Sequence, residues 1–214
     1  MLKYLTIFSY ILIALLLTNC ASGPSSVEFT SAKTKARSER NLKDAESYAL
    51  QALSLEAHAQ DAQVPYFLAT EIYKPQKNWT KVIEMFDEAM KRDSEAMLLQ
   101  PLMYNNKPIY KMQDQINIYY KNELWFILFN KAVKMYEDDL TDPEIIKLLE
   151  LAMYVDPNNV KAYILLATTY NINDNLNAAK ELINNALKLE SLQVEEKARL
   201  SSILAEFYKQ ENNY

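Results

Sequence analysis

The chain has 214 residues, half of them apolar, with a formal net charge of −5 and one glycine, one histidine and one cysteine. An acidic chain without a basic cluster is not expected to bind nucleic acid, because phosphate neutralisation needs grouped lysine and arginine side chains. The lone histidine and cysteine exclude a Cys/His zinc site or a disulfide framework within one chain. The scarcity of glycine argues against Rossmann folds and phosphate-binding loops, which leaves long helices joined by short polar turns.

Residues 1–19 have the composition of an export signal. Lys3 precedes a mostly apolar run from Leu5 to Leu17. As a helix this run would be roughly 20 Å long, against about 30 Å for the hydrocarbon core of a bilayer. It is too short to span a membrane comfortably and is typical of the apolar region of a signal peptide.

Cys20 stands directly after this region and is preceded by Leu17, Thr18 and Asn19. The arrangement resembles the lipobox of bacterial lipoproteins, although Asn19 replaces the usual small residue. The resemblance implies acylation of Cys20, cleavage before it, and a flexible tether over residues 20–28. Because no Asp follows the cysteine, it also implies the outer membrane, with the domain facing the periplasm. An ordinary secretory signal with a chance cysteine is the alternative.

Two adjacent 34-residue units, 126–159 and 160–193, repeat the same pattern of apolar and small residues. Two antiparallel helices can pack closely only where small residues stand at their crossing. The recurring positions carry Phe129, Ala132, Val133, Tyr136, Ile145, Leu149 and Ala152, and then Tyr163, Leu166, Ala167, Tyr170, Ala179, Ile183 and Ala186. This pattern resembles the tetratricopeptide repeat (TPR).

Further units of the same kind are expected on both sides of this pair. Unit 63–96 keeps the register, and unit 26–59 has a clear second helix but a mostly polar first helix, as a terminal cap needs. A last amphipathic helix over 195–210 would cap the other end. The predicted fold class is therefore all-α: a TPR-type solenoid of helical hairpins over residues 29–214, wound as a right-handed superhelix, with an irregular insertion.

The insertion at residues 97–125 does not fit the repeat. From about Gln113 a helical periodicity returns and continues to about Asp139, whereas Pro101, Pro108 and an Asn-Asn pair interrupt the segment before it. The many apolar residues of 98–110 are expected to be buried. They would either pack on neighbouring helices as a structural element or lie along the repeat groove as a lid.

The sequence offers no set of residues for catalysis. His58 lies in a turn with no obvious carboxylate partner and is expected at the surface. The acidic cluster Glu137–Asp139 does not match a calcium loop, and Asp142 is expected to cap a helix that begins at Pro143. We therefore predict no enzymatic activity, no cofactor and no metal site.

The resemblance implies that partner proteins bind along the first helix of each repeat, at positions 2, 5, 9 and 12 of the unit. A mixed surface of apolar and charged side chains would suit an amphipathic segment of an envelope protein. The candidate partner-binding residues are Phe67, Glu71, Lys74, Asn130, Lys134, Lys161, Ile164 and Asn171.

The predicted function is accordingly that of a lipid-anchored scaffold or adaptor of the cell envelope. The alternative is a protein that binds a glycan or small solute through aromatic side chains of the insertion. The aromatic residues that would serve this alternative are Tyr104, Tyr110, Tyr119, Tyr120 and Trp125.

Overall fold

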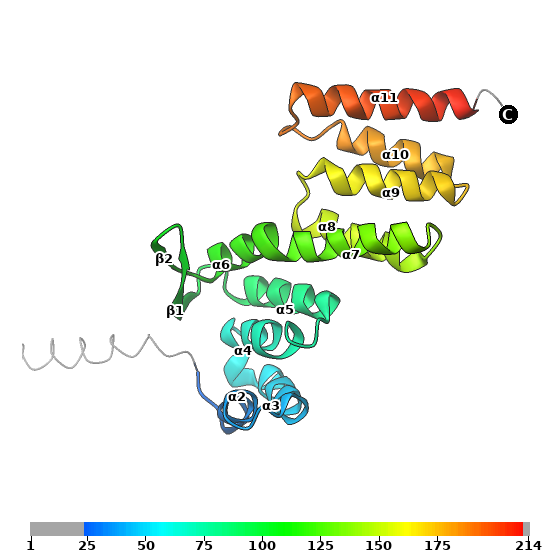
Figure 1. Cartoon of the computed structure of the whole chain (residues 1–214). Coiled ribbons are helices and arrows are strands. Elements are labelled where there is room, and N and C mark those ends of the chain that lie inside the picture. Colours follow the sequence, from blue (N-terminus) through cyan, green and yellow to red (C-terminus); the bar gives the residue numbers. More distant parts are fainter. Residues whose placement is uncertain (1–23, 212–214) are drawn as a thin grey trace, which may run out of the picture. The chain divides into compact units, whose positions relative to one another are not determined.

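The computed structural model of the protein describes residues 24–211, in two compact units (Figure 1). Unit 1 ends at Ile116 and unit 2 begins at Asn117. The predicted signal segment 1–19 and Cys20 lie outside the described residues. Within residues 24–211, no helix is both long enough and apolar enough to cross a membrane.

Unit 1 consists of helical hairpins followed by a two-stranded sheet. Helices α2 and α3 pack on each other, and α4, with its continuation η2, packs on α5. The elements are α2 (Val27–Arg37), α3 (Leu42–Ser54), the 3₁₀ turn η1 (Glu56–His58), α4 (Gln63–Phe67), the π-helical η2 (Leu68–Tyr73), α5 (Trp79–Arg92), β1 (Met97–Tyr104), β2 (Lys107–Lys111) and the start of α6 (Met112–Tyr119).

The described residues of unit 2 form helices joined by turns, with no strand among them. Each helix from α7 to α11 packs on the next one in the chain, so that the unit is built from successive helical hairpins. The elements are the π-helical η3 (Tyr120–Leu124), α7 (Trp125–Asp138), α8 (Pro143–Val155), α9 (Val160–Ile172), α10 (Leu176–Ala186) and α11 (Val194–Glu211).

Most helices begin at a side chain that caps them. The Asp142 carboxylate accepts a hydrogen bond from the Glu144 N–H at 2.8 Å, which confirms the predicted cap of α8. Such caps satisfy backbone donors that have no partner within the helix. The other capping residues are Ser26, Asn41, Asn78, Asn159 and Asn175, so the asparagine-rich composition has a structural use. Because Ser26 caps α2, the helix begins at Val27, inside the predicted tether.

Three of the hairpin turns use a left-handed residue that is not glycine. Arg40, Lys77 and Asp174 have φ angles of 53°, 57° and 57°, each one residue before a capping asparagine. A left-handed non-glycine residue costs about 1–2 kcal/mol. These turns adopt positive φ angles without glycine, because burial in the adjoining helices offsets the cost at single turn positions.

The repeat register predicted from the sequence is confirmed by burial. In the second helices of the three clear units, the small residues Ala89, Ala152 and Ala186 have no exposed surface. The larger side chains of the register, Phe86, Leu149 and Ile183, are buried beside them. The fold is all-α with TPR-type helical hairpins, because these alanines let the helices approach closely.

The C-terminal helix covers the last hairpin of unit 2. Leu200 and Phe207 of α11 enter the cluster that Ile183 and Ala186 of α10 share with α9. The cap predicted over 195–210 extends over Val194–Glu211. The rest of α11 is largely exposed, as the end of a repeat array requires.

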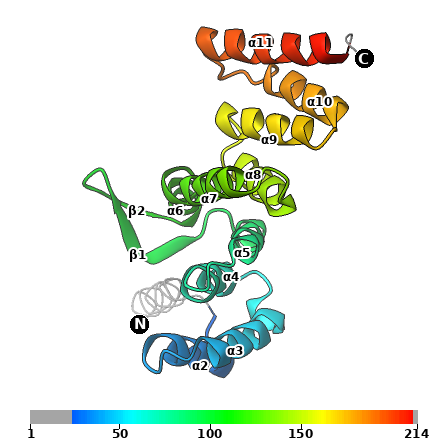
Figure 2. The same cartoon turned by 45° about the vertical axis from the view of Figure 1, so that its right-hand side comes forward.

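The insertion differs most from its prediction. Residues 97–111 are not irregular but form the antiparallel β1–β2 hairpin, with Asn105 and Asn106 in left-handed conformations at the turn (Figure 2). Such an Asn-Asn pair suits the two-residue turn of a β-hairpin. From Met112 the chain is helical to Asp138 through the π-helical turn η3, which confirms the helix predicted from about Gln113.

The apolar side chains of the hairpin are largely exposed, so the prediction that they are buried was wrong. Met97, Leu99 and Met103 have 61%, 69% and 62% of their surface accessible. A two-stranded ribbon has two faces and few residues with which to cover them, so its side chains can be buried only by another element.

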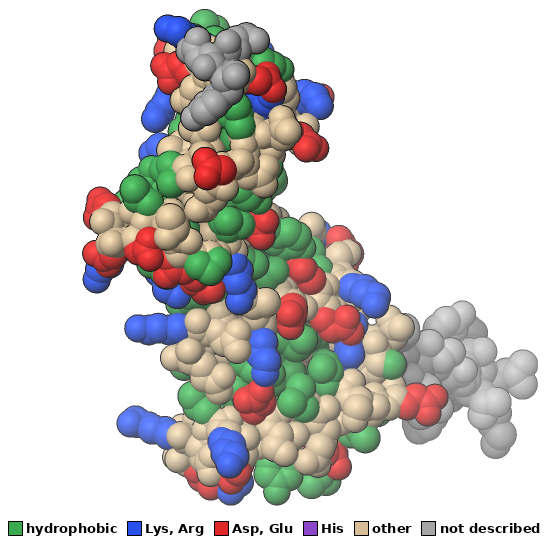
Figure 3. Space-filling view, turned by 90° about the vertical axis from the view of Figure 1, so that its right-hand side faces the viewer, with side chains coloured by type: hydrophobic (Ala, Val, Ile, Leu, Met, Phe, Trp, Pro, Cys, Tyr) green, Lys and Arg blue, Asp and Glu red, His purple; other side chains and the backbone are tan. Residues whose placement is uncertain are grey.

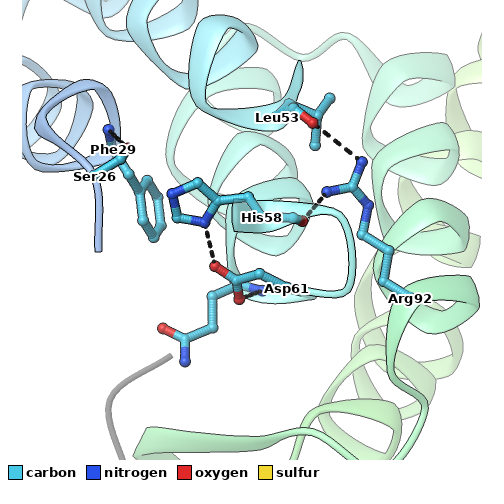
Figure 4. A network of polar contacts seen from close by, with 7 residues as sticks. Ser26, Phe29, Leu53, His58, Asp61 and Arg92 are labelled. Atoms are coloured by element: carbon cyan, nitrogen blue, oxygen red, sulfur yellow. Dashed lines mark hydrogen bonds and ion pairs between the residues drawn. The ribbon is translucent and has the colours of Figure 1, made fainter. Parts of the chain in front are cut away.

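His58 is buried in unit 1 rather than exposed as predicted. Its Nδ1 lies 2.7 Å from the Asp61 carboxylate, and its ring meets Phe29 edge-on (Figure 4). The Arg92 guanidinium donates to the carbonyl oxygens of His58 and Leu53, at 2.7 and 3.4 Å. This network ties the turn after α3 to the end of α5. The imidazole has no surface accessible to solvent.

Candidate functional site

A groove in unit 1 collects the first helices of two successive repeats and one strand of the hairpin. Its volume is about 430 Å³. We call it the unit 1 groove. Its lining residues are Phe29, Lys33 and Arg37 from α2, Gln63, Tyr66, Phe67, Thr70 and Glu71 from α4 and η2, Leu98–Leu102 from β1, and Gln115 from α6.

The helical side of the unit 1 groove is built on an aromatic pair with cations beside it. Phe29 and Phe67 meet edge-on, with ring centroids 5.6 Å apart. Lys33 Nζ lies 4.4 Å from the centre of the Phe29 ring, and the Arg37 guanidinium lies 5.9 Å from that of Phe67. Arg37 also pairs with Glu71 at 3.0 Å. Phe29 and Phe67 are themselves almost fully buried, each with 4% of its surface accessible, so the groove presents charges of both signs above an apolar floor.

The opposite side of the unit 1 groove is the edge of β1. Five consecutive residues, 98–102, line the groove. Because side chains alternate between the faces of a strand, an unbroken run of lining residues means that the strand presents its edge to the groove. The pairing with β2 is also irregular between Met97 and Leu102. Backbone groups of this bulged segment thus stand at the groove wall.

Gln115 holds the hairpin against the repeat. Its amide nitrogen donates to the carbonyl oxygens of Gln100 at 3.3 Å and Ile109 at 2.7 Å, and its oxygen accepts from the Tyr66 hydroxyl at 3.0 Å. Burial, with a smaller contribution from the charge of Glu71, raises the pKa of Tyr66 to about 12. Tyr66 therefore remains a hydrogen-bond donor at any physiological pH.

Part of the second repeat's first helix, which lines the groove, is π-helical. Thr70 and Glu71 lie in η2, where the chain makes wider turns than in an α-helix. The Thr70 hydroxyl donates to the Tyr66 carbonyl oxygen at 2.9 Å. Short π-helical segments are rare and occur frequently at functional sites. This local departure from the repeat adds weight to the unit 1 groove as a site.

A second hollow of about 470 Å³ borders the start of β1 and shares Gln63, Leu98 and Leu99 with the unit 1 groove. It is lined by Pro24, by residues 60–63 at the start of the second repeat, and by residues 95–99. Asp61, Asp93 and Glu95 contribute carboxylates to it. The described N-terminal end of the chain therefore lies beside β1.

The sequence-predicted partner-binding residues divide between the two units. Phe67 and Glu71 line the unit 1 groove, while Lys74, also in unit 1, is not part of its lining. Val64, a position of the same set, is fully buried and has no surface for a partner. In unit 2, Asn130, Lys134 and Lys161 are exposed, whereas Ile164 and Asn171 are half-buried.

Other lining residues were missed by the sequence reasoning. Phe29, Lys33 and Arg37 lie on a first helix that was interpreted only as a polar cap, although their spacing of four residues places them on one helical face. Gln115 was predicted as part of a helix but not as part of a site. The available signal was its place beside Ile116, at the start of the predicted helix. A glutamine that is buried there needs hydrogen-bond partners.

The described residues offer little to catalysis or metal binding. Among residues 24–211, no group of three or more His, Cys, Asp or Glu side chains is placed to hold a metal ion. On the face shown in Figure 3, basic and acidic side chains are interspersed, so that no field of one sign forms there. Among the described residues, the unit 1 groove thus combines charged and hydrogen-bonding groups without a metal-ligand set.

The aromatic residues of the insertion do not form the exposed set that the alternative function needs. Trp125 is buried and stacks on Phe129, with ring centroids 4.7 Å apart. The hydroxyl oxygens of Tyr119 and Tyr120 are also buried. Tyr104 and Tyr110, on the hairpin, keep exposed rings. A glycan-binding platform built from all five aromatics is contradicted by the burial of Trp125.

Comparisons with known proteins give similarity in structure only. No family model matches the sequence, and no curated protein matches it. Yeast Tom70 is 20% identical with a TM-score of 0.38, over 86% of this chain and 33% of that one. YrrB, a TPR protein with an unusual peptide-binding site, is 16% identical with a TM-score of 0.32, over 84% of this chain and 93% of its own. This chain spans about a third of Tom70.

Proposed function

We propose that this protein is a lipid-anchored scaffold of the bacterial cell envelope that holds an extended segment of a partner protein in the unit 1 groove. The lipobox-like sequence ending at Cys20 supports anchoring at the outer membrane, with the helical domain in the periplasm. The TPR-type hairpins support a protein or peptide as the partner. The glycan alternative has no comparable support, because its central aromatic, Trp125, is buried.

The edge of β1 is the observation that carries the proposal. An extended peptide could lie parallel to residues 98–102 and form backbone hydrogen bonds with them, as in strand addition to a sheet edge. Its side chains would then meet Lys33, Arg37 and Glu71, which lie over the nearly buried aromatic rings of the helical wall. Each strand of a two-stranded sheet has one edge that is not paired with the other strand. The free edge of β1 lies where these aromatics are.

The charges of the unit 1 groove indicate what kind of segment would fit. Lys33 has its ammonium group beside the Phe29 ring, while Arg37 and Glu71 already neutralise each other at 3.0 Å. An apolar segment with an acidic residue near Lys33 would complement this arrangement. Because the groove is only partly apolar, we expect the segment to be amphipathic.

Site-specific photo-crosslinking in living cells tests the proposal. A photoreactive amino acid replaces Lys33, which lines the unit 1 groove, or Lys43, an exposed lysine of α3 outside it. We expect position 33 to crosslink to one short segment of a single envelope protein. The added substitution Thr70→Trp, which fills the groove, should abolish that product.

The control position decides how a positive result is interpreted. Equal crosslinking at positions 33 and 43 would show non-specific contact and would contradict the proposal. The same holds if the product at position 33 survives Thr70→Trp. Lipid anchoring is tested separately by Cys20→Ser, which should release the protein from the membrane fraction while leaving its helical circular dichroism spectrum unchanged.

A further inference from the structure

The β1–β2 hairpin carries more exposed large apolar side chains than any other element of the described residues. Six of the fifteen large hydrophobic residues that are exposed between residues 24 and 211 lie on it: Met97, Leu99, Leu102, Met103, Tyr104 and Tyr110. Contiguous exposed apolar patches on soluble proteins mark contacts with another protein or a membrane. Met103, Tyr104 and Tyr110 are not part of the unit 1 groove, so a partner in that groove would leave them uncovered.

The charge of the hairpin differs from that of the whole chain. Residues 96–113 contain Lys107 and Lys111 but no aspartate or glutamate, whereas the chain carries a net charge of −5. Lys111 pairs with Glu95 at the base of the hairpin, and Lys107 directly follows the Asn105–Asn106 turn. Because Glu95 neutralises Lys111, the tip offers the charge of Lys107 beside its apolar side chains, which complements a surface that is apolar below and anionic at its boundary.

The tip also has the residues that suit the boundary between water and lipid. Tyr104 precedes the turn, and a tyrosine has an apolar ring with a polar end that favours the headgroup region. Met103 beside it is flexible and apolar, and is 62% exposed. The two asparagines at the turn can remain hydrated among the headgroups.

The N-terminus brings the hairpin close to any membrane in which the chain is anchored. Pro24 lines the same hollow as Met97, Leu98 and Leu99. It follows Cys20 by four residues, which span at most about 14 Å when fully extended. An acyl anchor on Cys20 would therefore hold Pro24 within that distance of the bilayer surface, with the start of β1 beside it across the hollow.

We propose that the β1–β2 hairpin rests on an anionic phospholipid bilayer, with Met103 and Tyr104 inserted at the headgroup boundary. The contact rests on the membrane anchoring that is part of the proposed function. This contact is a second, weaker attachment to the membrane, in addition to the acyl anchor on Cys20. Two points of attachment hold the domain in a defined orientation to the membrane. The unit 1 groove, on the other edge of β1, is then held at a fixed height above the lipid.

The test places a fluorescent label on the lipidated full-length protein. With Cys20 acylated, Met103→Cys gives the chain a unique thiol for an environment-sensitive dye, and Leu50→Cys, at an exposed leucine of α3, serves as the matched control. The proteins are reconstituted in vesicles of phosphatidylethanolamine and phosphatidylglycerol with a nitroxide on the acyl chains. We expect quenching at position 103 to be at least about threefold stronger than at position 50, since interfacial side chains reach the acyl boundary.

Three results would overturn the proposal, and they have different meanings. If the protein does not float with the vesicles, both the anchor and the hairpin contact are excluded. If it floats but both labels emit as in water, the anchor stands and the hairpin contact is wrong. A blue-shifted dye at position 103 without nitroxide quenching would mean that protein, such as a second copy of the chain, covers the hairpin instead of lipid.

Discussion

The repeat at residues 63–96 and the β1–β2 hairpin that follows it in unit 1 are both rich in large apolar residues, yet they differ in burial. In the repeat, Val82, Phe86 and Ala89 recur on one face of α5 and have almost no exposed surface. In the hairpin, Leu99 and Met103 remain mostly exposed. Spacing that matches the helical period gives a side chain a neighbouring helix to pack on, and the hairpin has no such partner within unit 1.

The same truncation in the two regions should have opposite consequences, and this is the largest effect that we predict. Leu68→Ala in the repeat removes a fully buried side chain and should lower the free energy of unfolding by about 2–5 kcal/mol. Leu99→Ala in the hairpin should change it by less than about 0.5 kcal/mol. Urea denaturation followed by circular dichroism measures both. Similar losses would mean that the hairpin is packed in the isolated protein and would break the comparison.

The two kinds of turn offer a smaller and more selective test. Lys77 in the repeat and Asn105 in the hairpin are both left-handed, with φ angles of 57° and 49°. Lys77→Gly relieves a steric cost and should raise the free energy of unfolding by about 0.5–1 kcal/mol, because glycine adopts this conformation without strain. Asn105→Gly should gain less, since asparagine tolerates left-handed angles.

A glycine within a helix controls for this effect of flexibility. Lys43→Gly, in the first turn of α3, should destabilise the protein by up to about 1 kcal/mol. Thermal unfolding curves of the three variants should therefore move in different directions. A decrease in melting temperature for Lys77→Gly would show that its side chain contributes more than its backbone strain costs.

The ion pairs of the two regions should differ in their dependence on pH, with the smallest predicted effect. In the repeats, Glu46 accepts from Tyr73 at 2.9 Å and Lys81 at 3.1 Å. Burial raises the pKa of Glu46, but the hydrogen bonds from Lys81 and Tyr73 outweigh it and hold the pKa below its ordinary value. The pair therefore stabilises the fold above the unfolded pKa of about 4.3 and loses this contribution as the pH falls through the folded pKa.

Glu46→Gln should accordingly cost about 0.5 kcal/mol at neutral pH, and the difference from the wild type should shrink at pH 3. Glu95→Gln, which breaks the exposed Glu95–Lys111 pair of the hairpin, is the matched control and should have no measurable effect at either pH. Denaturation midpoints at several pH values would separate the two. A constant difference for Glu46→Gln across the acid range would assign its contribution to packing alone.

The sequence by itself determined the helical repeats of this protein. Helix period, buried alanines at fixed intervals and a capping residue at the start of most helices are local properties, and each follows from a few consecutive residues. For this reason the register of residues 126–193, the cap at Asp142 and the helix from Met112 were all predictable. The lipobox-like segment ending at Cys20 was likewise read from local pattern, and remains a prediction.

Only the tertiary structure decided the surroundings of His58, the exposure of the β1–β2 hairpin and the composition of the unit 1 groove. His58 is buried because Phe29 and Arg92, each about thirty residues away, close over a turn that looks exposed in the sequence. The groove forms because Gln115 ties a strand to the first helix of a repeat across intervals of six to forty-nine residues. Contacts between residues so far apart in the chain produce no periodic pattern in the sequence, because their energy depends on which surfaces folding brings together.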